Sequence, residues 1–223
     1  FDVDHPAMLG VVQNQDSYMA GKVAQRHFYG QVKSAMREAF DEFYRNTGRR
    51  YDFIETHGME DAEYAIVALG STAETAAVTL DYIRKQGYKA GSVNITSYRP
   101  FPAAELVEAL KNVKAFAVLE RLDIPLGDEN PLTVEIQAAF AKAAMGTEGF
   151  PKIDRVPVSY SGSAGLGSRD VTPGHMLAVV ENMARAGEDG YGRRYFSLGI
   201  DHVSALTVTE EPDVRPPGSF SIR

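Results

Sequence analysis

The chain has 223 residues, 44% hydrophobic and 24% charged, with a formal net charge of -7, so we expect one soluble globular domain with appended ends and a sizeable core. The acidic balance, with lysine and arginine interspersed among the acids, argues against a nucleic-acid partner, which requires a concentrated basic patch. No apolar run approaches the roughly 20 residues that span a bilayer, and residues 1–6 lack the features of a signal peptide, so we expect a cytoplasmic protein with no membrane partner.

A long helical pattern comes first, from about Asp16 to Asn46. Its apolar residues recur mostly three to five positions apart, which predicts that one face is buried. Asp16 or Ser17 is suited to start the helix and Gly48 to end it. Gly21 and Gly30 weaken its middle, so the segment is expected as one helix or two, with an apolar stripe that needs a partner surface. The stripe consists of Val23, Phe28, Val32, Met36, Phe40 and Phe43.

After Asp61 the pattern changes to alternating strands and helices. Buried apolar strands that alternate with amphipathic helices predict a three-layer α/β fold, with a mostly parallel sheet, right-handed crossovers and helices on both faces. The expected strands are 64–69, 91–96, 115–119, 155–160 and 195–200, and the expected helices are 72–86, 103–112, 132–145 and 172–185. Residues 215–218 are typical of a linker, and residues 220–223 alternate like the start of a strand.

Ligands of such a sheet bind at the carboxyl ends of its strands, so the loops there are the candidate site. Gly70, Ser71 and Thr72 place small residues at a helix start, where they either bind an anion such as phosphate or only cap the helix. Arg99 and Arg169 are candidate anion clamps, because a guanidinium presents a fork of donors. For Arg169 the other interpretation is an internal or interdomain ion pair.

Other chemistries find less support. Glu120, Arg121 and Asp123 suggest acid–base chemistry, a metal site or a solvated loop with salt bridges. The five histidines lack the spacing of a zinc site, and no serine lies in a Gly-x-Ser-x-Gly pattern. The absence of cysteine excludes disulfides and thiolate ligation of an iron–sulfur cluster by this chain. We therefore predict no catalytic residue and no metal site.

One run joins a glycine loop to a helix: residues 165–173, in which Thr172 is suited to cap the helix and Pro173 to its first turn. Together with four other segments it resembles pyruvate:ferredoxin oxidoreductase and the wider 2-oxoacid:ferredoxin oxidoreductase family. Ser168 departs from the family pattern, in which glycine is frequent at this position. The other segments, in the same order as in that family, are 2–6, 61–75, 98–101 and 196–202.

The resemblance implies a domain organisation. Residues 1–58 correspond to the C-terminal part of a thiamine-enzyme domain and a connecting helix. Residues 59–208 correspond to a transketolase-C-terminal-like α/β domain, the second of the family. Residues 209–223 correspond to a linker and the start of a following domain.

The resemblance also implies a function. The complete enzyme would use thiamine diphosphate, Mg²⁺, iron–sulfur clusters and coenzyme A to convert a 2-oxoacid, expected to be pyruvate, into acyl-CoA, CO₂ and reduced ferredoxin or flavodoxin. Its partners would be the other domains or subunits, and it would form a homo-oligomer. We expect this segment to be a non-catalytic structural portion that binds no cofactor alone, with Gly70, Ser71, Thr72, Arg99 and Arg169 on the coenzyme A side or at a domain interface. The alternatives are a free-standing interaction module or subunit, and the equivalent domain of a transketolase or 2-oxoacid dehydrogenase.

Overall fold

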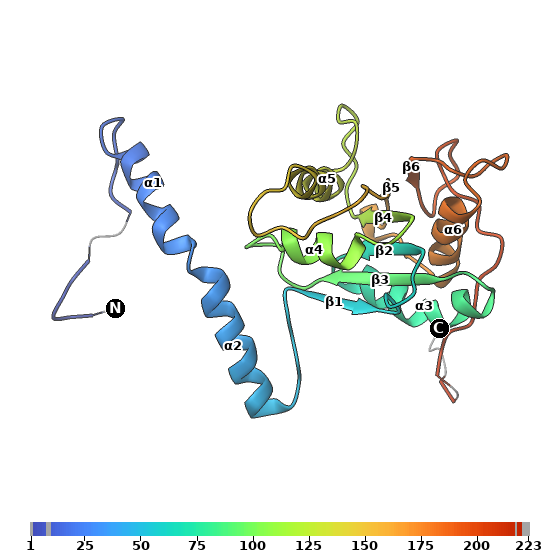
Figure 1. The fold of residues 1–223 in the computed structure, drawn as a ribbon, viewed down its shortest axis with the longest axis horizontal. Coiled ribbons are helices and arrows are strands. Elements are labelled where there is room, and N and C mark those ends of the chain that lie inside the picture. Colours follow the sequence, from blue (N-terminus) through green and yellow to red (C-terminus); the bar gives the residue numbers. More distant parts are fainter. Residues whose placement is uncertain (1, 8–9, 217, 220–223) are drawn as a thin grey trace. The chain divides into compact units, whose positions relative to one another are not determined.

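A computed structural model describes residues 2–7, 10–216 and 218–219, and the chain divides into two compact units, residues 1–50 and 51–223. The strand start expected at 220–223 lies outside the described residues. The first unit holds two helices in succession, α1 (Tyr18–Tyr29) and α2 (Val32–Thr47) (Figure 1). Gly48 ends α2 in the left-handed conformation, with φ 72°, as its position in the sequence predicts.

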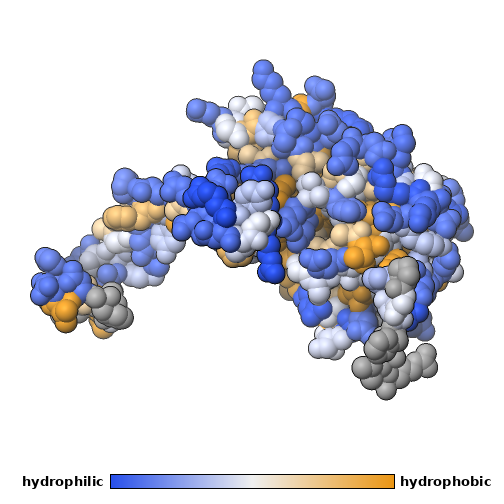
Figure 2. All heavy atoms as spheres, turned by 90° about the horizontal axis from the view of Figure 1, so that it is seen from below, coloured by the Kyte–Doolittle hydropathy of each residue, from blue (hydrophilic) through white to orange (hydrophobic). Residues whose placement is uncertain are grey.

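The apolar stripe of these helices is not buried as the sequence predicts. No residue of α1 or α2 is buried by the described part of the chain. Val23 is 54% exposed and Phe28 is 69% exposed, and apolar residues reach the surface of this unit (Figure 2). The physical reason is that the unit consists of two helices in series and supplies no second layer to cover the stripe.

The second unit is built on a six-stranded sheet with strand order β1-β3-β2-β4-β5-β6 (Figure 1). All neighbouring strands are parallel except β1 and β3, which are antiparallel. The strands are β1 (Ile54–His57), β2 (Tyr64–Ala68), β3 (Ala90–Ile95), β4 (Ala115–Glu120), β5 (Val158–Ser163) and β6 (Tyr195–Ser197). The helices are α3 (Ser71–Lys85), α4 (Ala103–Leu110), α5 (Pro131–Ala144), α6 (Pro173–Ala184) and the short 3-10 helix η1 (Leu166–Ser168).

Two cores lie on opposite faces of this sheet. Because side chains of a strand alternate between faces, Ile66 of β2 packs with α3 and α6, whereas Val67 packs with α4 and α5. The predicted three-layer α/β fold with helices on both faces is therefore confirmed.

Three strand predictions need correction. The sequence analysis missed β1, and it placed the fourth strand at 155–160, whereas β5 runs from Val158 to Ser163. The last strand ends at Ser197, not at Ile200. The first two errors involve strands with polar residues: β1 contains Glu55 and His57, and the second half of β5 is Ser-Gly-Ser. Hydrophobic alternation does not reveal such strands.

Candidate functional site

The strand order of the sheet reverses between β2 and β4. From β2 the chain crosses to β3 on one side, and it then returns to place β4 on the other side. In an open parallel sheet this switch point leaves a crevice at the carboxyl ends of the two strands. A cavity of 470 Å³ lies there, and its lining includes Leu69, Gly70, Ser71, Thr72, Tyr98 and Arg121.

The segment Gly70–Thr72 forms the start of α3. Gly70 has φ 58° and ψ -140°, a conformation suited to glycine, and its carbonyl accepts the amide of Ala73 at 3.0 Å. No side chain caps this helix, so Ser71 and Thr72 do not serve as the caps that the sequence analysis weighed. Helix geometry also leaves their backbone amides without an intrahelical acceptor. The segment therefore lines the crevice with unused hydrogen-bond donors.

Arg99 is engaged with α5. Its guanidinium lies 4.1 Å from the ring centroid of Tyr98 and forms an ion pair with Glu135 at 3.2 Å. The Tyr98 hydroxyl donates to the same carboxylate at 3.0 Å. An external anion that binds Arg99 would therefore have to compete with Glu135 for the guanidinium group.

Arg169 lies in different surroundings from Arg99. With Ser71 and Thr72 it lines a smaller cavity of 230 Å³ next to the start of α3. Its Nη1 donates to the carbonyl of Gly199 at 2.7 Å. Among the described residues no carboxylate pairs with it, so the internal ion pair considered from the sequence is not formed there. The structure brings Gly70, Ser71, Thr72 and Arg169 to one edge of the sheet.

The glycine loop before α6 adopts left-handed backbone conformations. Gly165, Gly167 and Ser168 have φ values of 72°, 62° and 61°. Ser168 is thus a residue other than glycine in a backbone conformation that favours glycine. It lies at the position where the pattern of the resembling family frequently has glycine. The loop turns the chain from the end of β5 into α6.

The start of α6 is capped as its sequence predicts, with an additional partner. Thr172 is the N-cap residue, and its backbone amide donates to Nδ1 of His175 at 2.9 Å. The carboxylate of Glu211 accepts the Thr172 hydroxyl at 2.7 Å and the Gly174 amide at 3.1 Å. Burial lowers the pKa of His175, and Glu211 opposes that effect. The bond from the Thr172 amide makes Nδ1 of the ring an acceptor.

Glu120 is an internal cap, not a solvated or catalytic acid. Its side chain accepts the backbone amides of Leu132 and Thr133 at 2.9 and 3.1 Å, at the start of α5, and the residue is 6% exposed. Asp123 accepts the hydroxyls of Tyr195 and Ser163 beside a further cavity of 630 Å³. Within the described residues no group of histidine, aspartate and glutamate could hold a metal ion.

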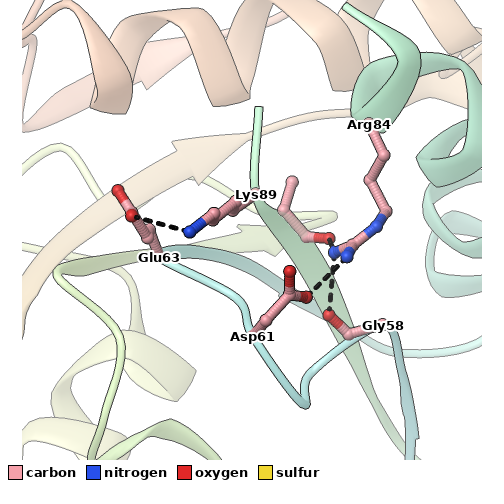
Figure 3. A network of polar contacts seen from close by, with 6 residues as sticks. Gly58, Asp61, Glu63, Arg84 and Lys89 are labelled. Carbon is pink, nitrogen blue, oxygen red and sulfur yellow. Dashed lines mark hydrogen bonds and ion pairs between the residues drawn. The ribbon is translucent and has the colours of Figure 1, made fainter. Parts of the chain in front are cut away.

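Residues 61–64, the first part of the segment 61–75 of the resemblance, belong to a structural network at the opposite end of the strands. Arg84 of α3 donates to the carbonyl oxygens of Ala90 and Gly58 at 2.9 and 3.3 Å and pairs with Asp61 (Figure 3). Glu63 pairs with Lys89 at 3.7 Å. These contacts tie the turn between β1 and β2 to the end of α3 and the start of β3, which explains the motif without a ligand.

The fold and the crevice define a three-layer α/β domain with a mostly parallel sheet, and comparison with known proteins identifies its family. Residues 62–176 match the family described as pyruvate:ferredoxin oxidoreductase core domain II. The chain belongs to this family.

The relatives are longer proteins. The chain is 34% identical to pyruvate synthase subunit PorA of Thermotoga maritima over 88% of this chain and 47% of the relative. It is 33% identical to a pyruvate-flavodoxin oxidoreductase of Nostoc sp. over 96% of this chain and 50% of the relative. A solved 2-oxoglutarate:ferredoxin oxidoreductase of Magnetococcus marinus aligns with 76% of this chain and 24% of its own, at 18% identity and a TM-score of 0.46. The chain thus spans half or less of these relatives. No helix in the described part of the chain has the length and apolar character needed to cross a membrane.

Proposed function

We propose that the chain is a non-catalytic structural portion of a thiamine-diphosphate-dependent 2-oxoacid:ferredoxin oxidoreductase that acts on pyruvate. The observation that carries this proposal is the family match over residues 62–176, together with relatives named for pyruvate. In the complete protein, pyruvate and coenzyme A would yield acetyl-CoA, CO₂, one proton and two electrons. The electrons would reduce ferredoxin or flavodoxin.

The cofactors of this reaction would be held elsewhere in the complete protein. Thiamine diphosphate supplies a stabilised carbanion when it is bound. The sequence has no cysteine for an iron–sulfur cluster and no Gly-Asp-Gly motif for a diphosphate–magnesium pair. The residues of this chain do not fit these groups, and we assign no step of the reaction to them.

The contribution proposed for this segment is packing between domains. Residues 59–208 would form the second domain, residues 1–58 would complete the preceding one, and residues 209–223 would lead into the next. Gly70, Ser71, Thr72 and Arg169 lie at the carboxyl edge of the sheet, which supports a role for that edge on the coenzyme A side or at a domain interface. Arg99 would join them only by sharing Glu135. The complete protein would be a cytoplasmic homo-oligomer.

An assay of the complete natural protein tests the activity. Reduction of ferredoxin should require both pyruvate and coenzyme A and should be much slower with 2-oxoglutarate. Reduction that is fast with 2-oxoglutarate and slow with pyruvate would overturn the substrate assignment.

Calorimetry tests the structural role of the segment. The 223-residue chain, titrated with thiamine diphosphate and Mg²⁺, should give no saturable heat. A micromolar dissociation constant, about -8 kcal/mol, would contradict the non-catalytic assignment.

A further inference from the structure

Arg121 differs from the other arginines of residues 51–216. Each of the others pairs with a carboxylate, donates to a carbonyl oxygen or lies over an aromatic ring. Arg121 has no hydrogen bond, ion pair or ring contact with any described residue. It directly follows β4, at the edge where the crevice of the sheet opens. Its guanidinium is therefore a cation available to a ligand in a place suited to ligands.

Glycine backbone lies next to both Arg121 and Arg169. A Cβ on Gly165 would lie 3.0 Å from Nε of Arg121 and 3.4 Å from its Nη2. A Cβ on Gly199 would likewise lie 3.2 Å from Cδ of Arg169. Each arginine thus lies against a glycine whose missing side chain leaves room for it. Arg169 is fixed by its hydrogen bond to the Gly199 carbonyl. A side chain that is fixed in advance, as Arg169 is, loses less entropy when a ligand binds.

The two arginines line one cavity of 230 Å³ from two different loops. Hydroxyl groups of Ser71, Thr72 and Ser168 line it too, and among described residues none of these three hydroxyls has a partner. The lining contains a single carboxylate, that of Asp170, against two guanidinium groups. The cavity therefore offers two forks of donors, further hydroxyl donors and a net positive charge.

We propose that Arg121 and Arg169 bind a phosphate group in this cavity, either free or carried on a small monoester. A carboxylate has two oxygens, which one guanidinium fork already satisfies, whereas a phosphate has at least three terminal oxygens for two forks and the hydroxyls. The proposal uses only residues of this chain, so it does not depend on the reaction of the complete oxidoreductase.

Titration calorimetry of the full chain tests the site, with inorganic phosphate and AMP as probes at constant ionic strength. Wild type should bind one equivalent with saturation. Arg121→Gln and Arg169→Gln should each weaken binding by about tenfold or more, because each removes one charged fork. Arg121→Gln should keep the wild-type melting temperature, since Arg121 makes no hydrogen bond, ion pair or ring contact with a described residue. Tighter binding of inorganic phosphate than of AMP would identify free phosphate as the ligand, and tighter binding of AMP would identify a monoester.

Lys85→Gln is the matched control, because it removes one positive charge at the other end of α3. It should leave binding unchanged. The proposal is overturned if wild type gives no saturable heat with either probe, if both arginine variants bind like wild type, or if Lys85→Gln weakens binding as much as they do.

Discussion

Gly162 lies in the middle of β5, where there is no room for a methyl group. Its register partners in the sheet are Leu119 of β4 and Phe196 of β6. A Cβ on Gly162 would lie 2.5 Å from Cε2 of Phe196, 2.6 Å from its Cζ and 2.8 Å from Cδ2 of Leu119. Phe196 is 0% exposed and Leu119 is 2% exposed, so neither side chain can move into solvent.

Gly162→Ala should therefore destabilise the domain. Overpacking of a full core lowers the free energy of unfolding by about 1–3 kcal/mol. Replacement of glycine by alanine also reduces the entropy of the unfolded chain, which raises that free energy by about 0.4–1 kcal/mol. The steric effect is the larger one, so the free energy of unfolding should fall by about 1–2 kcal/mol in total. At about 2–4 °C per kcal/mol for a domain of this size, the melting temperature should fall by about 2–8 °C.

Thermal unfolding of the full chain, followed by circular dichroism, measures this effect. Phe196→Leu provides the control, because it removes the ring atoms that the new methyl group would meet. The double variant should lose less stability than the sum of the two single variants, since the two sites are in contact. If Gly162→Ala melts at or above the wild-type temperature, the steric reasoning is refuted.

Three further predictions concern the pH dependence, the network at the start of the sheet and the apolar stripe. Because burial lowers the pKa of His175, its contribution to stability should be complete above the ordinary histidine pKa of 6.5 and should be lost as the pH drops below that value. His175→Gln should flatten that slope in denaturant titrations, because glutamine can still accept the Thr172 amide but does not titrate. Arg84→Gln should lower the melting temperature more than Lys89→Gln, since Arg84 holds two carbonyls and Asp61 whereas Lys89 has one ion pair. Phe28→Asp should leave melting of the 223-residue chain unchanged, because Phe28 is 69% exposed, but should weaken assembly of the complete protein.

Each of these three has a clear contrary result. A pH slope that persists in His175→Gln would mean that other groups cause it. Equal melting of the Arg84 and Lys89 variants would mean that the carbonyl contacts add nothing to the ion pair. A lower melting temperature of the Phe28→Asp chain alone would mean that the stripe is packed within these residues.

Much of the α/β unit could be predicted because its strands and helices carry strong patterns. The run Tyr64–Leu69 is continuously apolar and ends at Gly70, and it forms β2 with a one-residue difference at its end. Its burial on both faces explains the signal, since both sides of a central parallel strand must be apolar. The glycine and threonine signals at Gly48 and Thr172 succeeded because they report local backbone geometry.

The rest depends on contacts that a pattern of single residues does not contain. The serines of β5 are buried because Asn130 and Thr133, about 30 residues away, supply hydrogen-bond partners. The sequence groups Arg121 with its acidic neighbours as acid–base chemistry, a metal site or a solvated loop with salt bridges, yet Glu120 points into the core as a helix cap. Only the folded structure shows that these two adjacent side chains lie in different surroundings, Glu120 in the core and Arg121 at the cavity. The one available signal was the position of Arg121 directly after a buried strand.

The two edge strands of the sheet, β1 and β6, are also its shortest strands. The strand β1 has four residues and carries Glu55 and His57. The strand β6 has three, and its backbone is already bonded to Ser204 and Leu206 of its own chain. Exposed edges of sheets are templates on which a second molecule can add a strand, and short, charged or covered edges prevent that addition. The mostly parallel sheet, slow to form because its pairings are distant in sequence, is thus protected at both margins against intermolecular β-aggregation.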